Sequence, residues 1–324
     1  MAQDAIYQNE HGQPTACKII RRSSANTRIQ LADGRRLLVP TASLHAAIGD
    51  DATASLELNR VIPRTPLEYF YRQLRKLKGS PADRFQRLTQ FLEGRAGPEG
   101  AHFLSELFTR SVNHGSSYSN REPFYPAVSR RRSNKRRRDT FAPQLVRRLS
   151  EASDPVTIGR FKVSFVDFEV YPFRTTRGCD ELGKPATSAG SGGMDLLLAS
   201  EMDSVQLPAV GEIKADSEQV GPTFAIIQSL MYASQITTLN QLQRLRDIYA
   251  GDGFFRTATR PRCDIFVILE TAPTKNQEDY SYATTLAEGL MKTAVSEHVR
   301  SITIARCGSE QLHFEVLGCF VAAR

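Results

Sequence analysis

Three short stretches of this chain carry side chains of the types that act on a phosphate ester. They are Gly192–Asp195, Gly211–Lys214 and Gln228–Tyr232. The first supplies an acid, the second an acid and a lysine two residues apart, and the third an amide and a phenol. Together these are the parts needed to hold a divalent cation against a phosphodiester. The pattern therefore predicts a metal-dependent site.

Glu212 and Lys214 lie in a stretch that is typical of a buried strand. Residues two apart project from the same face of a strand, and the preceding residues Leu207–Gly211 are apolar or small. Buried charges are tolerated mainly when they are paired or bind a metal. We therefore expect Glu212 and Lys214 to face one common site.

Asp195 begins a second apolar run, Leu196–Ala199, which predicts a neighbouring strand. Residues 200–206 are long enough for a hairpin loop that returns the chain antiparallel. This hairpin brings Asp195 close to Glu212. Two adjacent carboxylates repel each other unless a cation lies between them, and hard oxygen ligands suit Mg²⁺ or Mn²⁺ rather than zinc. We expect Mg²⁺, with Lys214 orienting the attacking water and stabilising developing charge.

A helix is expected to begin at Pro222, which follows Gly221, because proline is favoured in the first helical turn and apolar residues then recur at helical spacing. Gln228 and Tyr232 are four residues apart and share one helical face. Their amide and phenol suit contact with a nucleic-acid backbone or with the attacking water. We therefore assign them a contact role and not a metal-ligand role.

The three stretches resemble the signature of the PD-(D/E)xK nucleases, specifically the RecB-like and lambda-exonuclease-like branch, which reads G-x-x-D, E-x-K and Q-x-x-x-Y. Met194 stands where the family name has a proline, a variation that this branch tolerates. The resemblance implies an α/β fold with a restriction-endonuclease-like core, in which helices flank a mixed central sheet. It extends from near residue 143 to residue 237, and sheet elements of the same kind continue to the end of the chain.

The resemblance also implies roles for individual residues. Asp195, Glu212 and the backbone carbonyl of Ile213 would bind the metal, and Asp195, Glu212, Lys214 and Gln228 would form the catalytic group. The family core often carries a further acid on a helix before its first strand.

Two residues are candidates for that further acid. Glu151 lies in the expected helix Pro143–Ala152, and Glu169 lies on the expected strand Phe161–Val170. Each of them by itself is typical of a surface carboxylate. The fourth site residue therefore stays open between the two.

Charge is distributed unevenly along the chain. Residues 1–150 carry 26 Lys and Arg against 13 Asp and Glu, whereas residues 151–324 carry 16 against 22. This asymmetry predicts that the N-terminal half attracts a polyanion while the acidic half holds the cation site. The densest basic run is expected to contact nucleic acid, or in a eukaryotic host to direct nuclear import. Its cations are Arg130, Arg131, Arg132, Lys135, Arg136, Arg137 and Arg138.

The sequence predicts four parts: a small β-barrel-like module at 1–62, a helical basic region at 63–128, a basic linker at 129–142 and the nuclease domain at 143–324. The module is indicated by alternating apolar and polar residues with a turn at Ala32–Gly34. It would read nucleic acid or dock a partner. In the helical region, one apolar stripe is most simply core, and its members are Leu67, Phe70, Tyr71, Leu74 and Leu77.

The rest of the nuclease domain alternates expected helices and strands, as in an α/β protein. Helices are predicted at 239–249 and 280–299, and strands at 264–270, 301–305 and 312–317.

Composition narrows the class of protein further. The chain has 324 residues and 40% hydrophobic content, enough for a substantial core. It has no apolar run of membrane-spanning length and no signal sequence, so we expect a protein of the cytoplasm, nucleoid-associated in a bacterium or nuclear in a eukaryote. Five scattered cysteines predict reduced thiols and not a zinc site. The absence of a phosphate-binding G-x-x-x-x-G-K-[ST] loop argues against an intrinsic ATPase.

The sequence therefore predicts a Mg²⁺-dependent nuclease that acts on DNA. We favour an endonuclease, because a separate basic region suits an enzyme that must find internal sites in restriction, transposition, defence or repair. The alternatives are an exonuclease, an RNA-processing nuclease, and a non-catalytic subunit whose nuclease-like core only positions nucleic acid. A partner protein or a homo-oligomer is compatible with each.

Overall fold

The structure is a computed structural model, and it describes residues 3–8, 14–22, 26–31, 36–40, 44–46, 65–96, 100–118, 140–170, 172, 193–215, 221–249, 251–256, 258–270, 277–308 and 312–322. The described residues fall into two compact units. The first holds those up to residue 46, and the second holds those from residue 65 onward. The helices between residues 66 and 118 thus share one unit with the C-terminal sheet.

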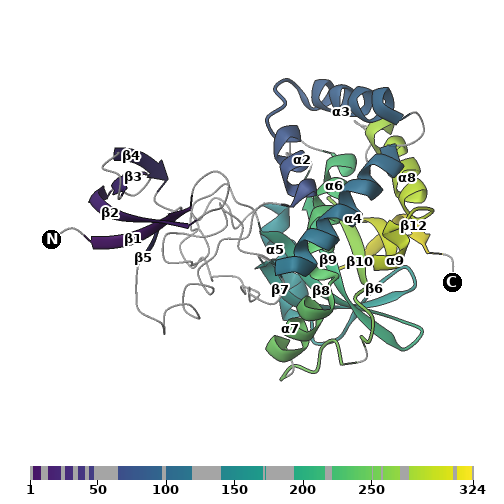
Figure 1. The fold of residues 1–324 in the computed structure, drawn as a ribbon. Coiled ribbons are helices and arrows are strands. Elements are labelled where there is room, and N and C mark those ends of the chain that lie inside the picture. Colours follow the sequence, from purple (N-terminus) through teal and green to yellow (C-terminus); the bar gives the residue numbers. More distant parts are fainter. Residues whose placement is uncertain are drawn as a thin grey trace. The chain divides into compact units, whose positions relative to one another are not determined.

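The first unit contains an antiparallel sheet with the strand order β4-β3-β2-β1-β5 (Figure 1). Strands β3 and β4 pair from Asn26↔Pro40 to Gln30↔Arg36, which confirms the hairpin expected around Asp33 and Gly34. The strands are β1 (Gln3–Gln8), β2 (Pro14–Arg22), β3 (Asn26–Leu31), β4 (Arg36–Pro40) and β5 (Leu44–Ala46).

The second unit is built on a seven-stranded mixed sheet with the order β12-β11-β10-β9-β8-β7-β6. The pairs β6–β7, β7–β8 and β8–β9 are antiparallel, the pairs β9–β10 and β10–β11 are parallel, and the pair β11–β12 is antiparallel. The strands are β6 (Val156–Ile158), β7 (Phe161–Val170), β8 (Met194–Met202), β9 (Val205–Lys214), β10 (Cys263–Leu269), β11 (Val299–Cys307) and β12 (Phe314–Val321).

The two ends of this strand order also approach each other, because β12 contacts β6 as well as β11. The sheet is therefore curled nearly into a barrel. A mixed α/β organisation, as expected from the sequence, is confirmed. The curl does not by itself identify a restriction-endonuclease-like core.

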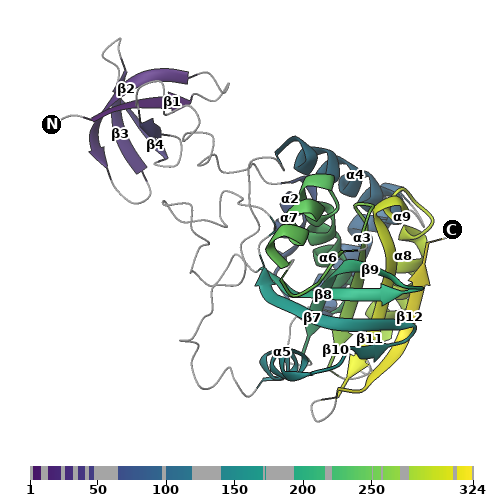
Figure 2. The same ribbon diagram turned by 90° about the horizontal axis from the view of Figure 1, so that it is seen from below.

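Helices cover both faces of the mixed sheet, as Figure 2 shows with α2, α4 and α6 on one side and α5 on the other. Helix α6 is buried along its whole length, and it contacts β9, β10, α2, α4 and α8. A helix that is apolar on all sides belongs in the interior of a protein. The helices are α2 (Pro66–Leu74), α3 (Pro81–Ala96), α4 (Gly100–Tyr118), α5 (Phe141–Glu151), α6 (Pro222–Ile236), α7 (Leu239–Tyr249), α8 (Gln277–Leu290) and α9 (Val295–His298). Of the described helices, none combines the length and the apolar content that crossing a bilayer requires.

The connection between β8 and β9 is shorter than the sequence predicts. The two strands pair as far as Met202↔Val205, so the turn consists only of Asp203 and Ser204. Both turn residues have positive φ angles, 51° and 61°. This is the backbone of a two-residue type I′ turn, whose twist matches that of the flanking strands. The predicted antiparallel hairpin is confirmed, but the loop bounds 200–206 are too wide. The sequence does not reveal the tighter turn, because neither turn residue is the glycine that usually marks one.

The continuous helix expected at 280–299 is also wrong, because α8 ends at Leu290 and the short α9 follows. Backbone hydrogen bonds from Lys292 to Gly289 and from Thr293 to Leu290 span three residues and not four. Such bonds tighten and end a helix. The hydroxyl of Thr293 donates a further bond to the Leu290 carbonyl.

A buried ion pair fixes the turn end of the β8–β9 hairpin to the rest of the sheet. Arg300 of β11 donates from Nε to Oδ1 of Asp264 on β10 at 3.1 Å. The same guanidinium donates to the carbonyls of Val205 (2.9 Å) and Ser200 (3.1 Å), one in each strand of the hairpin. Asp264 is fully buried and Arg300 is nearly so. This cluster holds four strands in register.

We expect Arg300→Leu to lower the free energy of unfolding by about 3–5 kcal/mol, because it leaves the Asp264 carboxylate buried without its counter-ion. Denaturant unfolding measures the change. Arg306→Leu is the matched control on the same strand, since Arg306 pairs with Glu315 where both side chains are more than 40% exposed. Its loss should cost at most about 1 kcal/mol. Equal effects of the two substitutions would contradict this reading of the ion pair.

Candidate active site

The β8–β9 ladder places Asp195 beside Glu212. Leu196 pairs with Gly211, so the next pair of residues in this antiparallel register is Asp195 and Glu212, with Cα atoms about 4.5–5.5 Å apart. The Asp195 carboxylate also accepts a hydrogen bond from the backbone N–H of Ile213, with 2.9 Å between Oδ2 and N. The three residues expected to bind a metal therefore lie together at the open end of the hairpin.

Glu212 and Lys214 face the helix layer and contact each other. The Lys214 ammonium donates to the Glu212 carboxylate, with 2.7 Å between Nζ and Oε1. Glu212 is 1% exposed and Lys214 is 8% exposed. Val210, on the same face of β9, packs in the core cluster that contains α6, whereas Ile213 packs in the cluster on the opposite face. A charged pair at this depth is the feature that the two-residue spacing predicts.

Helix α6 brings Gln228 to the same side of the sheet. The helix begins at Pro222 after Gly221, where a side-chain Cβ would lie 1.8 Å from the carboxylate of Asp279. Asp279, in the first turn of α8, accepts a hydrogen bond from the Thr223 N–H at 3.1 Å and so satisfies the start of α6. Burial raises the pKa of the Asp279 carboxyl. These contacts fix where α6 begins.

Tyr71 of α2 joins the site, although the sequence predicts it as plain core. Its phenol is 9% exposed and donates a hydrogen bond to Oε1 of Gln228. Burial raises the pKa of Tyr71 to about 12, and the charges of Lys214, Glu212 and Asp195 all act on the phenol. The missed signal was the residue type, because a buried tyrosine hydroxyl in an otherwise Leu and Phe stripe needs a hydrogen-bond partner.

The position of Tyr71 follows from how α2 is anchored. Thr65 caps the helix by accepting from the Glu68 N–H at 3.2 Å, and Pro66 occupies the first turn. The Leu67 N–H donates to the hydroxyl of Ser111 on α4 at 3.0 Å. Helix α2 is therefore held at its N-terminus, and Tyr71 follows one turn later on the buried face.

Tyr232 lies one turn after Gln228 on α6 and is 5% exposed. It packs in the core cluster that also contains Leu230 and Val210. Little of its surface is open to a nucleic acid in this conformation. The basic run that contains Arg130, Arg131, Arg132, Lys135, Arg136, Arg137 and Arg138 lies outside the described residues.

The two candidates for a fourth acid are placed very differently. Glu151 is exposed at the end of α5, where it pairs with Arg147 at 2.8 Å, and α5 covers the other face of the sheet. Glu169 lies opposite Asp195, because Val170 pairs with Met194 on one side and Phe168 pairs with Leu196 on the other. Its φ of 49° shows a local irregularity in β7. Glu169 is therefore the acid that the sheet brings next to the site.

The donors at the open end of the hairpin suit a hard divalent cation. The N–H and C=O of a strand residue point to the same neighbouring strand, so the Ile213 carbonyl shares an edge with its N–H, which bonds Asp195. Among the residues that the structure describes, no group of three or more His, Cys, Asp and Glu side chains could hold a metal. Mg²⁺ is usually held by one or two carboxylates, with water and substrate phosphate completing the shell. The two carboxylates and the carbonyl fit that requirement.

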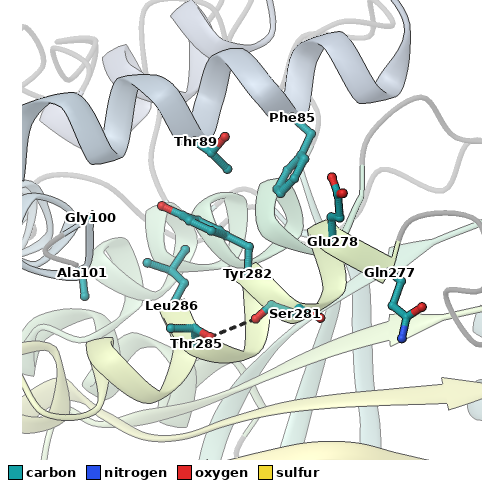
Figure 3. A pocket seen from close by; sticks show the side chains of 10 residues that line it. All are labelled: Phe85, Thr89, Gly100, Ala101, Gln277, Glu278, Ser281, Tyr282, Thr285 and Leu286. Carbon is teal, nitrogen blue, oxygen red and sulfur yellow. Dashed lines mark hydrogen bonds between the residues drawn. The ribbon is translucent and has the colours of Figure 1, made fainter. Parts of the chain in front are cut away.

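A separate hollow of about 880 Å³ lies between α3 and α8 (Figure 3). Its aromatic lining comes from Phe85 and Tyr282, whose rings meet edge to face at 5.9 Å between centroids. Glu278 is the single charged residue among those that line it. Because it offers neither paired acids nor a cation, we place the candidate chemistry at the β8–β9 hairpin.

We expect Gly193→Ala to destabilise the fold by about 1–3 kcal/mol, as overpacking in a dense region does. The added Cβ would lie 2.7 Å from the backbone C and O of Glu169, which pushes the start of β8, and with it Asp195, away from β7. Denaturant unfolding measures the loss. Gly308→Ala is the matched control, because nothing lies within 4 Å of a Cβ at that position. The packing argument fails if the two variants unfold at the same denaturant concentration.

Comparisons of this chain with known protein families, with curated proteins and with solved structures found no match. The argument for a function therefore rests on the residues and geometry of the site. The central group consists of Asp195, Glu212, Lys214 and Gln228, together with Tyr71.

Proposed function

We propose that this protein is a Mg²⁺-dependent nuclease that hydrolyses phosphodiester bonds in DNA. The observation that carries the proposal is the buried Glu212–Lys214 pair beside Asp195, at the open end of two paired strands. Burial of a charged pair is by itself weak evidence for stability, and what supports a functional role for this pair is its place beside the Asp195 carboxylate at the open end of the hairpin. A site that must bind a cation and a phosphate needs both charges.

The chain's own residues can perform the steps of phosphodiester hydrolysis. Asp195, Glu212 and the Ile213 carbonyl would hold the metal ion, which when bound polarises a phosphoryl oxygen and lowers the pKa of water. Lys214 would orient the attacking water and stabilise the negative charge that develops on the phosphate. Its hydrogen bond to Glu212, with 2.7 Å between Nζ and Oε1, holds the amine beside that carboxylate.

The order of elements around the site supports the same proposal. Helix α5 precedes the antiparallel run β6-β7-β8-β9, and helices α6 and α7 then connect β9 to the parallel strand β10. A mixed sheet flanked by helices, with a helix before the first strand, is what the resemblance to PD-(D/E)xK nucleases implies. We therefore include a restriction-endonuclease-like core in the proposal.

A polyanionic substrate is supported by the charges on α2 and the turn that follows it. Arg75, Lys76 and Lys78 are exposed there, and the charge of Arg75 lowers the pKa of Tyr71, so Arg75 lies near the site phenol. Cations in this position can neutralise phosphates on either side of the cleaved bond. DNA is the proposed polymer, and competition with an RNA oligonucleotide of equal length tests that choice.

We expect Asp195→Ala and Lys214→Met each to lower Mg²⁺-dependent cleavage of plasmid DNA by roughly 10²- to 10³-fold, the usual effect of removing a group that stabilises the transition state. EDTA should abolish cleavage by the wild type. Lys292→Met is the matched control, because Lys292 donates to Glu288 at the same distance of 2.7 Å but on the surface. Its activity should equal that of the wild type.

Two results would count against the proposal. Cleavage that persists in Asp195→Ala would show that the chemistry lies elsewhere. Binding of DNA without any metal-dependent product from the wild type would favour the alternative class, a nucleic-acid-binding subunit whose core only positions its ligand.

We expect the enzyme to act within a DNA strand, so that supercoiled plasmid is converted first to nicked circles and only later to shorter products. An endonuclease needs no free end, whereas an exonuclease degrades linear plasmid and leaves closed circles intact. Gel electrophoresis of closed and linear plasmid, incubated side by side with Mg²⁺, separates the two. If only the linear plasmid is degraded and the closed circles stay intact, the enzyme is an exonuclease and not an endonuclease.

A further inference from the structure

Tyr71 reaches the proposed nuclease site from outside the three sequence stretches that define it. Its phenol on α2 donates a hydrogen bond to Oε1 of Gln228 on α6, across 157 positions of sequence. Both side chains are less than 10% exposed. The contact is therefore a long-range tertiary feature that fixes two buried polar groups against each other.

The chemistry of this hydrogen bond decides which end of the Gln228 amide is left for a ligand. A side-chain amide has one carbonyl oxygen, which accepts, and one NH₂ group, which donates twice. Because Tyr71 engages the oxygen, the donating end is the one that remains. A phosphodiester offers acceptors and carries negative charge, so it pairs with the NH₂ group and is repelled by the carbonyl oxygen.

Tyr71 can serve as a donor at any physiological pH. Burial raises the pKa of its phenol to about 12, so the hydroxyl keeps its proton. Lys214, Glu212 and Asp195 also act on the phenol electrostatically, which places the Tyr71–Gln228 contact within the field of the proposed catalytic group. The hydroxyl thus holds Gln228 in one orientation next to the acids and the lysine.

We propose that Tyr71 is a positioning residue of the active site, which turns the Gln228 amide so that its NH₂ group faces a phosphate oxygen of the nucleic acid. This inference rests on the proposed function. It gives α2 a role beyond packing, because the helix that ends just before Arg75 also sets the orientation of a substrate-binding amide. Tyr71 acts through Gln228.

Four variants test the proposal by cleavage kinetics with Mg²⁺ and by fluorescence anisotropy of a labelled DNA oligonucleotide with Ca²⁺ in place of Mg²⁺. Tyr71→Phe removes only the hydroxyl and should raise KM and the oligonucleotide Kd about 5- to 30-fold, the range for a lost buried hydrogen bond, with kcat little changed. Gln228→Ala should have a similar or larger effect. The double variant should be no worse than Gln228→Ala alone, since the two residues act as one unit. Gln228→Glu should weaken binding at least as much as Gln228→Ala, because it still accepts from Tyr71 but places carboxylate oxygens against the phosphate.

Tyr280→Phe is the matched control. It also removes one tyrosine hydroxyl, which donates to the Leu317 carbonyl at 2.7 Å, but it does so beside β12, which is a neighbour of neither β8 nor β9 in the strand order. Its KM and Kd should equal those of the wild type. Unfolding curves of all variants separate loss of binding from loss of structure.

The possible outcomes distinguish the two proposals. Cleavage by the wild type with unchanged KM and Kd in Tyr71→Phe would overturn the role of Tyr71 and leave the nuclease intact. Additive effects in the double variant would also overturn it. The wild type could bind the oligonucleotide without ever cleaving DNA, while Tyr71→Phe binds it more weakly. That result would retain the role of Tyr71 in orienting the amide and reject the nuclease. A wild type that binds no oligonucleotide would reject both.

Discussion

The site depends first on the antiparallel pairing of β8 with β9. That ladder sets Asp195 opposite Glu212 and lets the Asp195 side chain accept from the Ile213 N–H, where the backbone pairing of the two strands ends. A shift of one residue in this register would send Asp195 to the opposite face of the sheet. The register is held at the far end by the tight turn and by Arg300, which donates to both strands.

The second constraint is the burial of charge. Glu212 and Lys214 are nearly inaccessible to water, and removing two ions from water costs several kcal/mol per ion in a protein interior. Their mutual hydrogen bond offsets part of that cost. Helices α6 and α2 lie on the same face of the sheet and carry Gln228 and Tyr71, whose side chains hydrogen-bond to each other. These four polar side chains therefore lie on a face of the sheet that is otherwise covered by apolar residues.

Much of this arrangement could be predicted along the chain, because the signals are local. The strand Phe161–Val170 and the helices at 222–236 and 239–249 follow from hydrophobic periodicity, from Pro222 and from apolar runs. The two predictions that were wrong, the loop bounds at 200–206 and the continuous helix at 280–299, also depended on local signals. The sequence predicts a longer loop where a two-residue turn without glycine occurs, and no proline marks the end of the helix at Leu290.

The sequence by itself determined which side chains carry charge and which strands and helices hold them, because residue type and spacing of two or four are readable along the chain. Tertiary structure alone decided which distant groups meet. It placed Glu169 beside Asp195 and left Glu151 on the other side of the sheet, and it brought Tyr71 to Gln228. The physical reason is that sheet register and helix packing are set by the whole core, so contacts across 157 residues leave no periodic trace in the sequence.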